Sequence, residues 1–146
     1  MALKVGDQAP GIQTPEFSLA SSKGQRVVLF FFPKADTPGC TKESCEFRDA
    51  SKAFSKKNAV IVGISPDKPA AQAKFAKKYS LPYTFVADPE HKIAEAYGVW
   101  KEKSMYGRKY MGIERSTFVI DEKGKIANIY EKVKVNGHAT TVLESL

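Results

Sequence analysis

The chain has 146 residues and a net charge of +7, and 42% of its residues are hydrophobic and 27% charged. This length and composition predict a single globular domain over residues 1–146 and exclude an intrinsically disordered protein. The 23 lysines and arginines are spread along the chain, so we expect no specific nucleic-acid partner. The longest apolar run, 27–32, is too short to cross a bilayer, and we expect no membrane partner.

The chain contains two cysteines, Cys40 and Cys45, too few for a disulfide-rich secreted scaffold. Its first residues lack the apolar core of a secretory signal peptide. We therefore expect a cytoplasmic protein. A processed plastid protein is the alternative that these residues leave open.

The first half of the chain predicts strands that alternate with helices. The segment RVVLFFF is continuously apolar, β-branched and aromatic, which is typical of a strand buried on both faces. Pro69 favours the first turn of a helix, and Asp67 is its candidate N-cap. The predicted strands are 17–20, 26–32 and 59–65, and the predicted helices are 40–57 and 70–79.

Helix 40–57 has a candidate inner side and a candidate outer side. Five residues at helical spacing are predicted to face the core: Cys40, Ser44, Phe47, Ser51 and Phe54. Four charged residues are predicted to lie mostly on the other side: Glu43, Glu46, Arg48 and Lys52.

The second half of the chain predicts a short strand and helix, then a hairpin. Gly98 ends the predicted helix 91–97, and residues 107–112 are predicted to form a loop. The turn before Gly124 predicts a hairpin. The predicted strands are 84–87, 116–120 and 126–130, and the last helix is 139–146.

The order of the predicted strands and helices along the whole chain predicts an α/β fold with a central mixed β-sheet flanked by helices, as in a thioredoxin-like fold. A flavodoxin-like sheet fits less well because of the late hairpin.

Cys40 lies where a buried strand, a Pro-containing loop and the start of a helix meet. The first N–H groups of a helix have no partner within it, and the helix dipole favours negative charge there. This position therefore stabilises a thiolate, and Cys40 is predicted to be a nucleophile. The alternative is a small buried core residue.

Cys45 lies five residues after Cys40. In an ideal helix this spacing separates the two Cα atoms by roughly 8.7 Å, which exceeds the limit of about 7 Å for a disulfide. The pair can therefore form a disulfide only if the first turns of the helix unwind. If Cys40 is oxidised to a sulfenic acid and the helix frays, Cys45 can condense with it. An ordinary core cysteine is the alternative for Cys45.

Other thiol chemistry fits the pattern less well. His91 and His138 show no ligand spacing relative to the cysteines, so no metal is expected. The spacing is not C-x-x-C, which weakens a disulfide reductase of the thioredoxin type. That oxidoreductase and a redox-sensing or chaperone module remain the alternative functions.

The residues around Cys40 carry a family resemblance. Pro33 to Cys40 has the form P-x-x-x-T-x-x-C and resembles the active-site motif of peroxiredoxins. The segments CTKESCEFRD, YGRKYMGIERSTFVID and VGDQAP are similar to the bacterioferritin-comigratory, or Q-type, subgroup. The resemblance covers nearly the whole chain, and the combination of segments is highly specific.

The resemblance implies a thioredoxin-fold peroxidase that reduces hydrogen peroxide and organic hydroperoxides without a cofactor. By likeness, Cys40 is the peroxidatic and Cys45 the resolving cysteine. Thr37 would hydrogen-bond the peroxide and the thiolate, and Pro33 would shield the site from water. Arg115 would stabilise the thiolate and the developing oxyanion. A surface salt bridge, a helix cap and a strand terminator are the alternative roles of Arg115, Thr37 and Pro33.

The resemblance also implies partners. Thioredoxin is the expected reductant, glutaredoxin is an alternative, and the subgroup favours a monomer. Glu43 matches the subgroup pattern and is expected to support the structure near Cys40. Trp100 and Tyr106 are expected either to line the approach to the site or to pack in the core.

Overall fold

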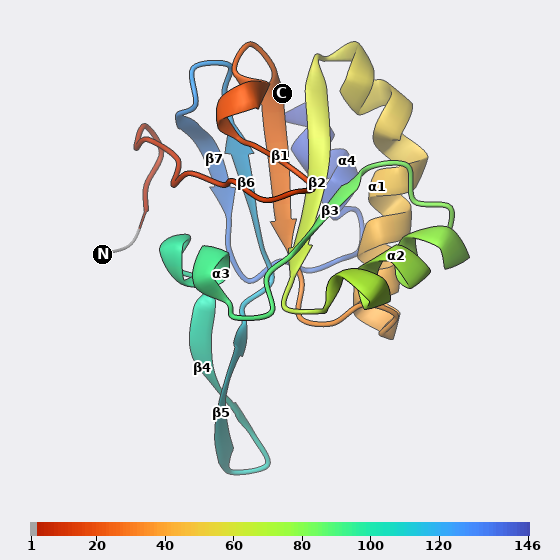
Figure 1. Cartoon of the computed structure of the whole chain (residues 1–146), viewed down its shortest axis with the longest axis vertical. Helices are drawn as coiled ribbons and strands as arrows, with labels where there is room; N and C mark the ends of the chain where they lie inside the picture. The colour runs from red at the N-terminus through yellow and green to blue at the C-terminus, as the bar shows by residue number, and fades with distance from the viewer. Residues whose placement is uncertain (1–2) are drawn as a thin grey trace.

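The computed structural model describes residues 3–146. Its centre is a five-stranded sheet in the order β3-β2-β1-β6-β7 (Figure 1). β1 pairs with β2 and β2 with β3 in parallel, whereas β6 is antiparallel to both β1 and β7. The predicted mixed sheet is therefore confirmed. Its strands are β1 (Arg26–Phe31), β2 (Ala59–Ser65), β3 (Thr84–Ala87), β6 (Ser116–Ile120) and β7 (Ile126–Tyr130).

Helices and the N-terminal segment cover both faces of the sheet. Phe30 and Phe32 face a core that α1, α2 and α4 complete, whereas Leu29 and Phe31 face a core shared with α3 and the N-terminal segment. Burial on both faces explains the continuously apolar sequence of β1. The helices are α1 (Pro38–Lys56), α2 (Pro69–Lys78), α3 (Lys92–Ala96), α4 (His138–Glu144) and the short 3₁₀ helix η1 (Ala20–Ser22).

Two predictions in the first half of the chain are wrong. Segment 17–20 is not a strand, and η1 begins at its end. The Ser18 hydroxyl accepts a hydrogen bond from the Ser21 amide, and the Ser18 carbonyl accepts one from the Ser22 hydroxyl, so local bonds favour a turn there. Asp67 is not the N-cap of α2, because Lys68 occupies that position. The Asp67 carboxylate instead accepts hydrogen bonds from the Ala35 amide at 2.7 Å and the Ser65 hydroxyl at 2.7 Å.

The predicted loop at 107–112 is also wrong. β4 (Trp100–Met105) and β5 (Arg108–Ile113) form an antiparallel hairpin that projects from one end of the sheet (Figure 1). Tyr106 and Gly107 make its turn with φ of 51° and 77°, as a two-residue type I′ turn requires. The hairpin has no alternating apolar pattern because most of its residues are exposed. Sequence periodicity therefore could not reveal it.

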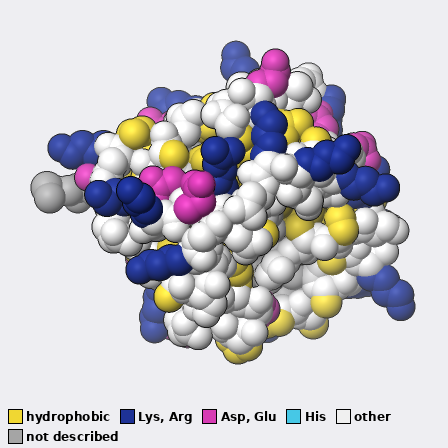
Figure 2. Space-filling view, turned by 90° about the horizontal axis from the view of Figure 1, so that it is seen from above, with side chains coloured by type: hydrophobic (Ala, Val, Ile, Leu, Met, Phe, Trp, Pro, Cys, Tyr) yellow, Lys and Arg dark blue, Asp and Glu magenta, His cyan; other side chains and the backbone are white. Residues whose placement is uncertain are grey.

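Charged side chains are dispersed over the surface. On the face seen in Figure 2, lysine and arginine side chains lie scattered, with acidic side chains between some of them. None of the helices within residues 3–146 combines the length and the apolar character needed to span a membrane.

Candidate active site

Cys40 lies in the first turn of α1. The N-terminus of α1 lies at the end of the sheet from which the hairpin projects (Figure 1). Only 1% of the Cys40 surface is exposed, and the residue belongs to the core that also contains Phe30 and Phe47. Pro38 occupies an early position of the helix, where its missing N–H costs nothing. The thiol therefore has a rigid position close to the positive end of the helix dipole.

Thr37 and Pro33 lie in the loop between β1 and α1, and both are partly buried. Thr37 is the N-cap residue of α1, but its hydroxyl makes no capping bond and donates to the Lys34 carbonyl at 2.8 Å. The Thr37 hydroxyl thus holds the loop in a tight turn. It retains acceptor capacity because a hydroxyl has two lone pairs.

Arg115 joins Cys40 to Glu43. Its Nη2 donates to Cys40 Sγ at 3.1 Å, and its Nη1 donates to Glu43 Oε1 at 2.6 Å. Arg115 precedes β6, which pairs with β1, so the sheet brings it to the start of α1 although it lies 75 residues from Cys40. The carboxylate fixes one side of the guanidinium, and the other side faces the sulfur.

Glu43 corrects the prediction of an outward-facing carboxylate. Its side chain is 1% exposed, and its Oε2 atom has no hydrogen-bond partner among the described residues. Residues three apart on a helix lie on the same side, so Glu43 shares the buried side of Cys40. Burial raises the pKa of Glu43 to about 7, although the nearby Arg115 charge acts to lower it. Burial acts to lower the pKa of Arg115, but attraction to Glu43 and Cys40 raises it.

Lys103 is a second cation near this cluster, and sequence reasoning missed it. It comes from β4, and its aliphatic chain lies over Gly112, where an added Cβ would be 3.4 Å from Lys103 Cδ. Burial and the positive charge of Arg115 lower the pKa of Lys103. Among residues 3–146 it has no acidic partner within salt-bridge distance. No local pattern identifies Lys103, because its position depends on the hairpin.

Cys45 lies two turns into α1. Both cysteines are free thiols, Cys40 buried and Cys45 partly buried. They occupy one continuous helix. A disulfide between Cys40 and Cys45 would require α1 to unwind locally.

Trp100 and Tyr106 lie away from Cys40. Trp100 packs against the core on the opposite face of the sheet and stacks on His91 with ring centroids 3.9 Å apart. Tyr106 is 99% exposed at the tip of the hairpin. Within the described part of the chain, no group of three or more His, Cys, Asp or Glu side chains could hold a metal ion.

Known proteins resemble this chain in sequence and in fold. Residues 5–129 match the AhpC/TSA family model. The chain is 44% identical over 151 residues to peroxiredoxin Bcp of Bacillus subtilis, covering 100% of this chain and 96% of that protein. It is 41% identical over 149 residues to peroxiredoxin Bcp of Escherichia coli, covering 99% and 96%. A crystal structure of a PrxQ mutant from Xylella fastidiosa superposes with a TM-score of 0.90 at 31% identity, covering 99% and 96%.

The chain belongs to the AhpC/TSA family of peroxiredoxins. Within that family it groups with the Bcp and PrxQ proteins, which confirms the predicted subgroup. The chain is therefore a thiol-dependent peroxidase with the predicted thioredoxin-like fold. Family membership implies a peroxide as the substrate and a thioredoxin-type dithiol as the reductant.

Proposed function

We propose that Cys40 is the peroxidatic cysteine of this enzyme. The contact of 3.1 Å between Arg115 Nη2 and Cys40 Sγ is the observation that carries the proposal. The Cys40 thiolate attacks one oxygen of the peroxide, the O–O bond breaks, and the leaving oxygen takes up a proton as water or an alcohol. Cys40 is thereby oxidised by two electrons to a sulfenic acid.

Arg115 stabilises the thiolate and the negative charge that develops on the oxygens. A guanidinium suits this role because it stays charged and presents several donors in one plane. Glu43 supports the role because its carboxyl group orients the guanidinium at 2.6 Å. A fixed donor stabilises a transition state better than a mobile one, because it need not reorganise during the reaction.

Thr37 and Pro33 shape the entrance to the site. The Thr37 hydroxyl is held in the turn before Cys40, where it is available to bind the peroxide. Pro33 has no backbone N–H to bind water and contributes a partly buried apolar ring to the loop between β1 and α1. Thr37 thereby positions the peroxide for attack in line with the O–O bond, and Pro33 shields the site from water.

Cys45 resolves the sulfenic acid. After the first turns of α1 unwind, the Cys45 thiol attacks the sulfur of Cys40, a disulfide forms and water leaves. A thioredoxin-type dithiol then reduces the disulfide, and glutaredoxin is the alternative donor. The chain acts in the cytoplasm as a monomer in this proposal.

The test is rapid oxidation of the reduced protein by stoichiometric hydrogen peroxide, with mass measured after an acid quench. Wild-type protein is expected to become two hydrogens lighter, and Cys40→Ser should abolish this fast reaction. Cys45→Ser is expected to stop at the sulfenic acid and to lose turnover with thioredoxin. Oxidation of wild-type protein no faster than that of a free thiol would refute the role of Cys40. Full turnover of Cys45→Ser would refute the role of Cys45.

A further inference from the structure

Helix α1 has to open between the two cysteines if Cys45 resolves Cys40. In the described state the helix is continuous from Pro38 to Lys56. Any contact that holds the backbone between Cys40 and Cys45 therefore opposes the resolving step. Such a contact also prolongs the life of the sulfenic acid, which a second peroxide oxidises to a sulfinic acid.

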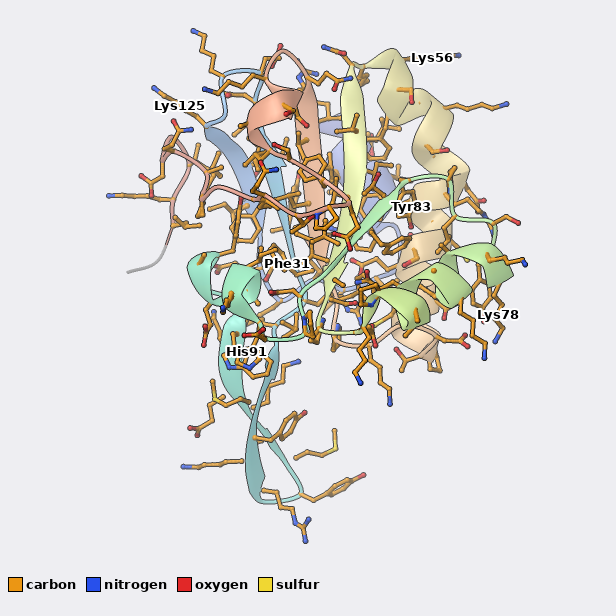
Figure 3. The ribbon with its side chains drawn as sticks, viewed as in Figure 1. Phe31, Lys56, Lys78, Tyr83, His91 and Lys125 are labelled. Atoms are coloured by element: carbon orange, nitrogen blue, oxygen red, sulfur yellow. The ribbon has the colours of Figure 1, made fainter. Side chains whose placement is uncertain are left out.

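Tyr83 makes one such contact. Its hydroxyl donates to the backbone carbonyl of Ser44 at 2.6 Å, and Ser44 is the residue before Cys45. The Tyr83 ring packs against Phe30 and Phe85 with centroids 5.7 and 5.2 Å away. Burial raises the pKa of Tyr83, so its hydroxyl remains a donor at physiological pH. Figure 3 shows Tyr83 between β3 and α1.

Three further bonds tie the same region to the segment that precedes Tyr83. Arg48, one turn after Ser44, donates to the Tyr79 carbonyl at 2.8 Å. Asp36, in the loop before Cys40, accepts from the Tyr79 hydroxyl at 2.8 Å and from Lys78 at 2.9 Å. Lys78 lies at the end of α2, away from the sheet (Figure 3). The Tyr83 bond differs from these because it alone acts on a backbone atom between the cysteines.

We propose that Tyr83 is a positioning residue for the resolving step, in which its hydroxyl holds the Ser44 carbonyl and so limits how fast Cys45 reaches Cys40. The inference rests on the proposed roles of Cys40 and Cys45. The bond keeps α1 wound while Cys40 faces Arg115, and it must break before the disulfide forms. Tyr83 thus sets the partition of the sulfenic acid between disulfide and sulfinic acid.

Tyr83→Phe removes the hydroxyl and keeps the ring in the aromatic core. A hydrogen bond of this kind shifts a local equilibrium by about fivefold. The unwound form of α1 is therefore expected to be about fivefold more populated in the variant, with disulfide formation accelerated by a similar factor. The peroxide concentration that converts half of Cys40 to sulfinic acid is expected to rise about fivefold.

Tyr97→Phe is the matched control. The Tyr97 hydroxyl donates to the Pro10 carbonyl at 2.7 Å, so this variant also loses one bond from a tyrosine to a backbone carbonyl. Its ring packs against Phe31 and Phe118 on the other face of the sheet. The control is expected to leave α1 and the partition at Cys40 unchanged.

Two measurements test the inference. The first is amide hydrogen exchange of residues 40–48 in the reduced proteins without peroxide, which reports the opening of α1 independently of catalysis. The second is the ratio of disulfide to sulfinic acid, measured by mass at increasing hydrogen peroxide.

Faster exchange and a higher ratio in Tyr83→Phe, with neither change in Tyr97→Phe, would support the inference. Equal exchange in Tyr83→Phe and wild-type protein would overturn it, as would an unchanged ratio. If wild-type protein forms no disulfide, the proposed role of Cys45 itself fails. The exchange data distinguish that failure from a failure of the Tyr83 inference, because amide exchange in the reduced protein does not depend on the cysteine chemistry.

Discussion

Glu43→Gln removes a buried titratable group from the active site and keeps an oxygen acceptor for Arg115. In the folded protein burial raises the pKa of Glu43 to about 7 from an ordinary value of 4.5. Between these two values the folded state binds a proton that the unfolded state has released. The free energy of unfolding of wild-type protein therefore contains a contribution from Glu43 that is fully present below pH 4.5 and is lost as pH rises through 7.

The magnitude follows from the difference between the two pKa values, about 7 and 4.5. Each pKa unit corresponds to about 1.4 kcal/mol, so the full effect is about 3 kcal/mol. Most of it falls between pH 5 and pH 8. Glu43→Gln lacks this contribution, and its stability relative to wild type is therefore expected to increase over that range.

Urea unfolding under reducing conditions at pH 5 and pH 8 measures the effect. The contributions of other titrating groups to the free energy of unfolding cancel when the variant is compared with wild-type protein at each pH. Glu102→Gln, which changes an exposed carboxylate on the hairpin, serves as the control. If Glu43→Gln and wild-type protein show parallel pH profiles, then Glu43 stays ionised in the folded protein. The ion pair with Arg115 would in that case outweigh the cost of burial.

Three further changes have expected outcomes. In a Glu43→Gln background, Arg115→Met should slow oxidation of Cys40 by about 10- to 100-fold in stopped-flow assays, because a charge-assisted hydrogen bond is lost. Equal rates with and without Arg115 would contradict this. Burial lowers the pKa of His138 to about 4 from 6.5. Wild-type protein should therefore lose about 3 kcal/mol relative to His138→Gln as pH falls from above 6.5 through 4, and parallel urea profiles would contradict this. Gly63→Ala should destabilise the fold by about 1–3 kcal/mol, because the new Cβ would lie 2.7 Å from a phenyl ring. A stability equal to that of wild type would show that the rings move aside.

The sequence by itself determined the central sheet. β2, β3, β6 and β7 have the predicted bounds, and β1 ends one residue earlier than expected. Continuous apolar runs and turn residues are local features, so strands buried on both faces can be identified from short segments. The residue pattern around Cys40 also lies within one segment, and for that reason it indicated the family before any contact was known.

Only the tertiary structure decided how the thiol is surrounded. It brings Arg115 to Cys40. It also buries Glu43 beside Arg115, although Glu43 was expected on the outer side of the helix, in solvent. The hairpin that carries Lys103 has exposed strands without a periodic pattern, and Tyr83 reaches Ser44 across 39 residues. Spacing along a helix predicts which side a residue takes, but it does not say what packs against that side. The strength of each charge and hydrogen bond at the site depends on that packing.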